Sequence, residues 1–184
     1  MLKSRKMVVM AGLMLLGFSM IALTGCEYRG ASFVREVLAN PGKYTAYSVI
    51  YSEPEFSTLK KALSSANLDD TFKMPGNYTI FAPTNAAFAR MPAGNLTSLE
   101  RDTNHQPLRN LLWYHISLVD ITSAAAKLQP VQTMGDGQKA LITSNGTKIT
   151  GIDGAHVVGK PIYCRNAVIY PIDAVLAPKP IGTH

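Results

Sequence analysis

The stretch Tyr78-Thr-Ile-Phe-Ala-Pro-Thr-Asn-Ala-Ala-Phe-Ala-Arg-Met-Pro92 decides the fold, because it predicts a buried strand that turns directly into a short helix. Its first residues are β-branched and aromatic, as in strands. Pro83 cannot donate to a sheet ladder, so strand pairing should stop there. Either Thr84 or Asn85 then caps the helix by accepting a hydrogen bond from its first turn, a contact worth about 1 kcal/mol.

Two phenylalanines flank this corner, and we expect them to hold it together. Phe81 in the strand and Phe88 in the helix are predicted to meet beneath the turn. Upstream, apolar residues recur every three or four positions, which predicts one buried face of a helix over residues 54–66, with Pro54 in its first turn. The residues of this face are Phe56, Leu59, Ala62, Leu63 and Ala66.

The two halves of the chain have different patterns. Short helices are predicted over 96–101 and 107–116, and a further one starting near Ser123. From Pro130 onward, alternating runs separated by glycine turns predict strands. These runs are 131–134, 139–143, 148–152, 156–158 and 167–170. A helical half followed by a meandering sheet predicts an α+β fold with antiparallel strands.

The first 26 residues have the three parts of a secretory signal peptide. Three basic residues among the first six precede the uncharged, mostly apolar run Met7–Leu23 and the sequence Leu23-Thr-Gly-Cys26. The last four residues resemble the bacterial lipoprotein box, whose cysteine receives fatty acids such as palmitate and becomes the new N-terminus. Two or more acyl chains hold a protein stably on a membrane. The alternative is an uncleaved transmembrane helix, because the apolar run approaches the roughly 20 residues needed to span a bilayer.

We therefore divide the chain into a lipoprotein signal peptide (1–25), a lipidated N-terminus and tether (26–43), one folded domain (44–178) and a tail (179–184). A length of 184 residues suits one domain and little more. Within the tether, Ser32–Asn40 is either a short amphipathic helix or a plain spacer. Glu27 follows Cys26, whereas aspartate there is the familiar inner-membrane retention signal of some Gram-negative bacteria. By that resemblance the outer membrane is favoured within the cell envelope.

Charge and cysteine content narrow the possible partners. The net charge of +6 falls to about +3 without the three basic residues of the leader, and no long basic run remains. Nucleic acid is therefore not an expected partner. If Cys26 carries lipid, Cys164 has no partner within the chain, so a disulfide framework is excluded. We expect Cys164 to be a small buried hydrophobe.

The sequence contains no recognised catalytic or metal-binding pattern. Its four histidines are scattered, and neither His-x-x-x-His nor Cys-x-x-Cys spacing occurs, so a zinc site has no support. There is no Gly-x-Ser-x-Gly elbow, phosphate loop or dinucleotide fingerprint. We expect no catalytic residue, no metal and no cofactor, and a protein that is not an enzyme.

The neighbours Tyr114 and His115 form the most tempting pair. Adjacent side chains on a helix point about 100° apart, so the two rings cannot both face one substrate. We expect one ring to lie inward and the other nearer the surface. The favoured prediction is that His115 is a core histidine whose ring N–H is satisfied, and contact with a ligand is the alternative.

Three segments, in order, resemble the signatures of the fasciclin-like adhesion domain. Phe81-Ala-Pro-Thr-Asn-Ala-Ala-Phe88 is similar to the first signature of that family. Leu111-Leu-Trp-Tyr-His-Ile116 resembles its central Tyr-His motif, and Val168-Ile-Tyr-Pro-Ile-Asp-Ala-Val-Leu-Ala-Pro178 resembles its closing segment. The likeness spans roughly Lys43 to Pro178.

The resemblance implies a single domain built as a twisted antiparallel β-sandwich with helices packed on one side. It also implies adhesion or binding to a protein, polysaccharide or matrix partner, with self-association left open. Trp113 and Tyr114 are then candidate partner-binding residues, because the family's adhesive contacts involve this segment. The structural motif residues would be Phe81, Pro83, Thr84, Asn85, Phe88, His115 and Asp173.

The chain also departs from the family pattern near its end. Asn166-Ala167 stands where Asn-Gly is usual, and Tyr170-Pro171 replaces the usual His-Val. Pro171 removes a ladder donor, which predicts an edge strand or a bulge and puts an adhesive role of the closing segment in doubt. Two other functions stay open on the same scaffold: a structural envelope lipoprotein, and a small-ligand carrier or enzyme.

Overall fold

A computed structural model describes residues 36–37, 39–40, 42–92, 94–101, 105–121, 131–135 and 137–178. The predicted signal peptide, Cys26, most of the tether, the helix near Ser123 and the tail lie outside these residues. The first sheet has the order β2-β1-β8-β7, with β1 (Tyr78–Pro83), β2 (Ile116–Ser117), β7 (Ile162–Tyr163) and β8 (Ala167–Ile172). The second has the order β3-β4-β5-β6, with β3 (Val131–Thr133), β4 (Lys139–Ser144), β5 (Ile149–Ile152) and β6 (Ala155–His156).

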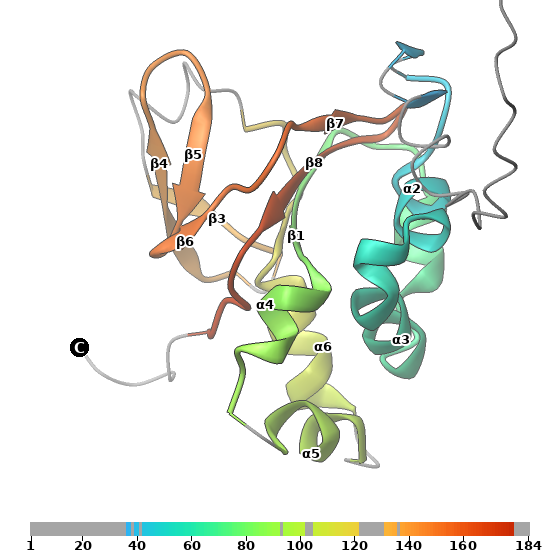
Figure 1. Cartoon of the computed structure of the whole chain (residues 1–184), viewed down its shortest axis with the longest axis vertical. Coiled ribbons are helices and arrows are strands. Elements are labelled where there is room, and N and C mark those ends of the chain that lie inside the picture. Colours follow the sequence, from blue (N-terminus) through green and yellow to red (C-terminus); the bar gives the residue numbers. More distant parts are fainter. Residues whose placement is uncertain are drawn as a thin grey trace, which may run out of the picture.

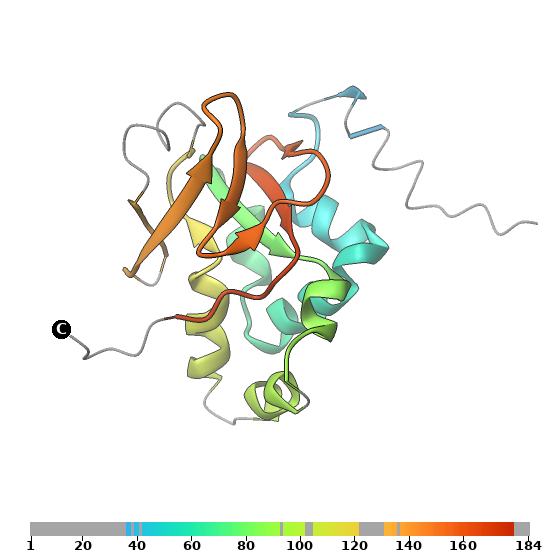
Figure 2. The same cartoon turned by 60° about the vertical axis from the view of Figure 1, so that its left-hand side comes forward.

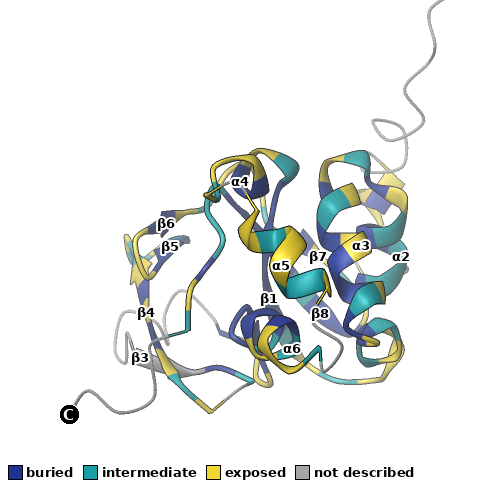
Figure 3. Ribbon diagram, turned by 90° about the horizontal axis from the view of Figure 1, so that it is seen from below, coloured by how far each residue is buried: buried dark blue, intermediate teal, exposed yellow. Residues whose placement is uncertain are grey.

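The helices gather on one side of the first sheet, and the second sheet lies on the other side (Figures 1 and 2). They are α2 (Ala46–Ser52), α3 (Ser57–Ser65), α4 (Asn85–Ala89), α5 (Asn95–Arg101) and α6 (Gln106–Trp113), with the short 3-10 helices η1 (Pro54–Phe56) and η2 (Asp69–Lys73). Figure 3 shows the buried residues facing inward between these layers. The predicted α+β class, with helices packed on one side, is confirmed.

The core has two parts, one on each face of the first sheet. The helix-side cluster joins Ile80, Ala82 and Ile169 to the apolar faces of α2, α3 and α6. The sheet-side cluster joins Phe81 and Tyr170 to the inward residues of β4 and β5. Successive side chains of a strand point to opposite faces. The strands β1 and β8 therefore belong to both clusters, and the whole fold is organised around them.

One pair of strands differs from the expected antiparallel arrangement. β1 and β8 run parallel, in a register that aligns Tyr78 with Ala167 and Pro83 with Ile172. Parallel neighbours need a long crossover connection, and here almost the whole second half of the chain provides it. The other strand pairs, β1–β2, β3–β4, β4–β5, β5–β6 and β7–β8, are antiparallel.

The strand-to-helix corner forms as its sequence predicts, with one exception. β1 ends at Pro83, and the Thr84 hydroxyl accepts a hydrogen bond from Ala87 N at 3.3 Å, so Thr84 caps α4. The expected contact between Phe81 and Phe88 is wrong. Phe81 points to the sheet-side cluster and stacks on Tyr170 at 5.6 Å between ring centroids, whereas Phe88 belongs to the helix-side cluster.

Asn85 connects two helices instead of capping its own. Its side-chain oxygen accepts from Thr58 N at 3.0 Å and from the Ser57 hydroxyl at 3.2 Å, and its amide donates to Pro54 O at 2.8 Å. It thus satisfies the first turn of α3, which would otherwise leave backbone donors without partners. The predicted helix over 54–66 is confirmed as η1 followed by α3, and all five residues of its apolar face are buried.

Two short strands escape the sequence pattern. The helix predicted over 107–116 ends at Trp113, and Ile116 begins β2. β7 was not predicted, because two residues are too few to show an alternating pattern. Both strands lie at the edges of the first sheet.

Candidate functional site

Tyr114 and His115 lie where α6 ends, between the two parts of the core, and both are buried. Tyr114 enters the sheet-side cluster, where its hydroxyl donates to the carboxylate of Asp153 in the β5–β6 turn. His115 points elsewhere, toward the closing segment and Leu176. The roughly 100° between neighbouring side chains thus directs each ring into a different layer.

The hydrogen bonds of His115 fix its protonation state. Nδ1 lies 2.7 Å from Leu111 O, and Leu176 N donates to Nε2 at 2.9 Å. A neutral ring with its proton on Nδ1 satisfies both contacts, whereas a charged ring would set an N–H against the Leu176 N–H. Burial lowers the pKa of His115 to about 4, so the ring stays neutral at physiological pH.

This geometry corrects the expectation that one of the two rings is near the surface. Tyr114 is 0% exposed, so it cannot contact a partner in this conformation. Trp113 is only partly buried, but its ring packs on the helix-side cluster and against Gly135, where an added Cβ would lie 2.4 Å from the indole. The Tyr-His segment connects the layers, and Trp113 is the one of the two candidate partner-binding residues that keeps a partly exposed side chain.

Asp173 ties the closing segment to two other parts of the fold. One carboxylate oxygen accepts from His156 N at 2.7 Å, and the other lies 3.3 Å from the Arg90 guanidinium, which follows α4. The His156 N–H, assisted by Arg90, holds the pKa of Asp173 below its usual range. Asp173 therefore joins α4, β6 and the end of β8.

Pro171 is not in an edge strand, because β8 lies between β1 and β7. Its carbonyl accepts from Val158 N at 2.8 Å, so its backbone faces away from β1. β7 pairs only with Val168 and Ile169, and it has already ended at this level of β8. A missing N–H is tolerated there, because the regular ladder on that side has stopped.

Asn166 is a buried anchor whose role sequence reasoning missed. Its side-chain oxygen accepts from Ala46 N at 2.9 Å, and its amide donates to Phe72 O at 3.0 Å and Met74 O at 2.8 Å. One side chain thus joins α2, the end of η2 and the start of β8. The local pattern suggests only a turn asparagine, because all three partners are about ninety residues or more away in the sequence.

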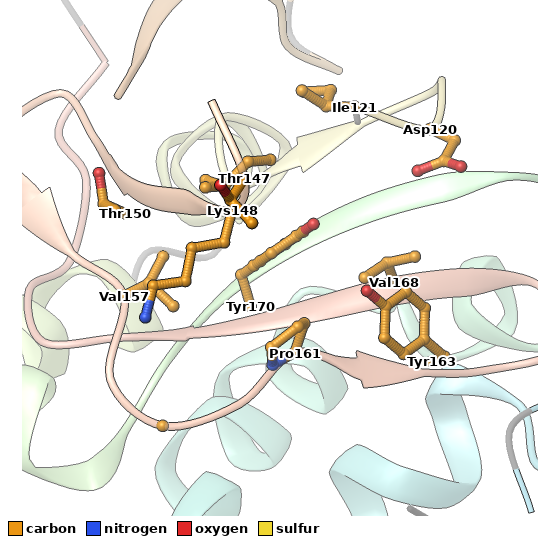
Figure 4. A pocket seen from close by; sticks show the side chains of 12 residues that line it. Asp120, Ile121, Thr147, Lys148, Thr150, Val157, Pro161, Tyr163, Val168 and Tyr170 are labelled. Atoms are coloured by element: carbon orange, nitrogen blue, oxygen red, sulfur yellow. The ribbon is translucent and has the colours of Figure 1, made fainter. Parts of the chain in front are cut away.

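A pocket of about 250 Å³ opens between the two sheets beside β7 and β8. Several separate segments line it. They contribute residues 120–121, residues 147–150, Val157, Gly159 and Pro161, Tyr163 of β7, and Val168 and Tyr170 of β8. Figure 4 shows the Tyr170 ring in the middle of the pocket, with its hydroxyl pointing into the open space. Burial, together with nearby Tyr163 and Asp120, raises the pKa of Tyr170 to about 12, so its hydroxyl remains a neutral donor.

Four exposed apolar residues either line this pocket or are within two positions of a lining residue in the sequence. Tyr163, which lines it, is 52% exposed, and Val158 lies between two lining residues. Leu118 and Val119, both more than half exposed, directly precede Asp120. We call these four residues the apolar rim. Large apolar residues that gather at one exposed place mark binding sites.

Three further features bear on function. Among the described residues, no three histidine, cysteine, aspartate or glutamate side chains come together as a metal site would require. No helix in this part of the chain is both long and apolar enough to cross a membrane. Cys164 is partly buried, and burial raises its pKa to about 12, which keeps the thiol protonated and unreactive.

Comparison with known proteins gives consistent relatives. The family model described as "Fasciclin domain" matches residues 54–178. "Protein sll1483" of Synechocystis is 31% identical over 163 residues, which cover 89% of each chain. "Cell surface glycolipoprotein MPB83" of Mycobacterium bovis is 34% identical over 140 residues, which cover 69% of this chain and 57% of that protein.

Among solved structures, the FAS1 domain pair of the insect cell adhesion molecule Fasciclin I has the same fold. It matches with a TM-score of 0.61 at 15% identity, over 74% of this chain and 52% of that one. At this identity the match speaks for the architecture alone. It confirms the expected fold of two packed sheets with helices on one side.

Proposed function

This chain belongs to the fasciclin domain family, and from that premise we propose that it is a lipid-anchored binding module of the cell envelope. It mediates adhesion by contacting a protein, polysaccharide or matrix partner. The observation that carries the proposal is the apolar rim around the pocket. Four of the six large apolar side chains that are exposed among the described residues belong to it.

The anchor is proposed from the sequence around Cys26. The leader, the lipoprotein-like box and the glutamate at position 27 favour acylation and the outer membrane. The name of the mycobacterial relative, a cell surface glycolipoprotein, supports a lipid-anchored protein at the cell surface. If Cys26 carries the lipid, metabolic labelling with palmitate should be lost in Cys26→Ala. Labelling that persists in this variant would place the lipid elsewhere.

We propose a non-enzymatic role. The described lining of the pocket includes no histidine, cysteine or serine, so the pairing of a serine or cysteine nucleophile with a histidine base does not occur there. Its two charged residues, Asp120 and Lys148, stand at opposite ends (Figure 4). His115, the most reactive residue type of the motif, has both ring nitrogens engaged inside the core. None of the relatives named above carries the name of an enzyme.

The proposal is tested by attachment of cells. A deletion strain should attach more weakly than wild type to its natural surface, and soluble residues 27–184 should compete with wild-type cells. The double variant Val119→Ser/Tyr163→Ser should compete poorly, because it removes apolar contact area from the rim. Met74→Ser is the matched control, since Met74 is 54% exposed but lies outside the rim.

One result would overturn the adhesive role, and another would overturn the assignment of its contact surface. If deletion leaves attachment unchanged, the adhesive function is wrong and a structural envelope role takes its place. If the rim variant competes as well as the Met74 control, the rim is not the contact surface. Melting temperatures of both variants, measured in parallel, show whether each one still folds.

A further inference from the structure

Two opposite charges stand at opposite ends of the pocket. Figure 4 shows the Lys148 ammonium beside Val157 at one end and the Asp120 carboxylate at the other, with the Tyr170 ring between them. The pocket is therefore dipolar along its length. Such an arrangement suits a ligand whose own charges are separated in the opposite sense.

Neither charge is compensated by the described part of the protein. The three ion pairs there, Lys43–Glu36, Lys73–Asp70 and Arg90–Asp173, are all elsewhere. The Tyr170 hydroxyl likewise has no hydrogen-bond partner among these residues and faces the open space. Tyr170 is 7% exposed, and it is the most buried of the polar side chains that line the pocket.

The walls between the charges are apolar and the space is small. Ile121, Val157 and Val168 line it together with the Tyr170 ring. A volume of about 250 Å³ lies just below the roughly 300–1,000 Å³ of pockets that hold drug-sized molecules. One residue-sized group therefore fits, with a methylene chain against the aromatic floor.

We propose that the pocket binds an extended zwitterion whose ammonium and carboxylate are separated by an apolar chain, as in the C-terminal lysine of a peptide or protein. The ligand ammonium lies against Asp120 with the phenol oxygens of Tyr163 and Tyr170 as further acceptors. The ligand carboxylate meets Lys148. A singly charged ligand would cover one pocket charge and leave it without a partner, which costs desolvation energy.

This inference rests on the proposed function and deepens it by naming the chemistry that the partner presents. A protein partner with an exposed C-terminal lysine would insert that residue and lay its surrounding surface on the apolar rim. Affinity of the inserted residue alone is therefore modest, and the rim supplies the rest.

The test uses the full-length protein in nonionic detergent and ligand-observed NMR titrations corrected with a detergent blank. The three probes have the same chain length. ε-Aminocaproic acid carries both a positive and a negative charge, n-hexylamine carries only the positive charge, and hexanoic acid carries only the negative charge. We expect ε-aminocaproic acid to bind about five- to tenfold more tightly than either single-charge probe, as expected for one additional partly desolvated ion pair. Equal binding of the three probes would overturn the inference.

Variants that remove one charge each test which end of the pocket binds which charge of the ligand. Asp120→Asn should weaken binding of ε-aminocaproic acid about five- to tenfold and leave hexanoic acid unchanged. Lys148→Met should weaken ε-aminocaproic acid similarly and leave n-hexylamine unchanged. Asp70→Asn and Lys61→Met are matched controls, because both residues are exposed on η2 and α3, away from the pocket. If the pocket variants bind like these controls, the assignment is wrong.

The two proposals can fail separately. If the rim variant loses attachment while the probes bind equally, the binding role stands and the zwitterion falls. If ε-aminocaproic acid binds selectively but the rim variant attaches normally, the pocket has its ligand and the adhesive surface lies elsewhere.

Discussion

At the scale of single residues, two buried titratable groups respond to pH in opposite directions. His115 is held neutral by its two hydrogen bonds, and burial lowers its pKa from 6.5 to about 4. Glu53 is 5% exposed, and its Oε1 has no hydrogen-bond partner in the described part of the chain. Burial, with Glu55 nearby, raises the pKa of Glu53 from 4.5 to about 7.

For His115 the folded protein binds the proton less tightly than the unfolded chain. Its contribution to stability is therefore complete above pH 6.5 and is lost as the pH falls toward 4. We expect His115→Gln to cost about 1–3 kcal/mol at pH 7, and this cost should shrink as the pH approaches 4. Denaturant unfolding of wild type and variant across this range checks it. A cost that does not change with pH would contradict the neutral buried ring.

For Glu53 the sign is reversed, because the folded protein favours the protonated carboxyl. The contribution of Glu53 to the stability of the fold is complete below pH 4.5 and is lost as the pH rises through 7. Glu53→Gln should therefore stabilise the protein by about 1–2 kcal/mol at pH 8 and have little effect near pH 4. A variant that is no more stable at pH 8 would show that Glu53 is charged in the fold without penalty.

The residue scale also shows what the sequence can predict. The capping role of Thr84 follows from its place between a strand and a helix, because its partner, Ala87, lies three residues away. The bonds of Asn85 and Asn166 reach residues that are far away in sequence, and a local pattern contains no sign of them. The inward direction of Tyr114 could not be read from helical spacing, because the segment has core on both sides.

At the scale of elements, one asparagine joins three of them. Asn166 is 3% exposed and bonds to backbone groups of α2, η2 and the residue following η2. In Asn166→Ala these backbone groups stay buried without partners, so we expect a loss of about 2–4 kcal/mol of unfolding free energy.

Asn145→Ala is the control for this prediction, measured by the same chemical unfolding. Asn145 is exposed, and its side chain accepts hydrogen bonds from Thr147 N and Lys148 N within its own turn, so its loss should cost less than about 1 kcal/mol. Equal effects of the two variants would mean that the long-range hydrogen bonds of Asn166 do not stabilise the fold.

Elements with a long, regular pattern could be predicted, and short or distant pairings could not. The helix over 54–66 and the β4–β5 hairpin follow from periodicity and turn residues. The two-residue strands β2 and β7 show no period. The parallel pairing of β1 with β8 depends on where two apolar runs meet in space, and neither run specifies the direction of its neighbour.

At the scale of the molecule, the two parts of the core share β1 and β8, and this predicts a single unfolding transition. Ile80→Val trims the helix-side cluster and Phe81→Leu trims the sheet-side cluster. Each should lower the free energy of unfolding, by about 0.5–1.5 kcal/mol for the first variant and somewhat more for the second, and each should thereby lower the same melting temperature. Far-ultraviolet and near-ultraviolet circular dichroism should report coincident melting. Two separate transitions would show that the layers unfold independently.

The pocket forms only when segments that are distant in the sequence come together, so no local motif predicts it. Asp120, Lys148 and Tyr170 come from three segments that are unremarkable when taken alone. They meet because β8 returns to the centre of the first sheet and the β4–β5 hairpin packs across it. The family resemblance pointed to the Tyr-His segment as the contact surface, and folding hides Tyr114 while exposing Tyr163.

The parallel pairing of β1 with β8 also imposes an order in time. Tyr78 pairs with Ala167, which lies roughly ninety residues later in the sequence. This side of β1 therefore has no neighbouring strand until that later segment has been made. Contacts that are so distant in the sequence form slowly, because a long loop must close first. A chain that leaves the ribosome N-terminus first thus cannot finish folding until nearly all of it has been made. For a protein with a predicted export leader, this delay would keep the chain incompletely folded until it has crossed the membrane.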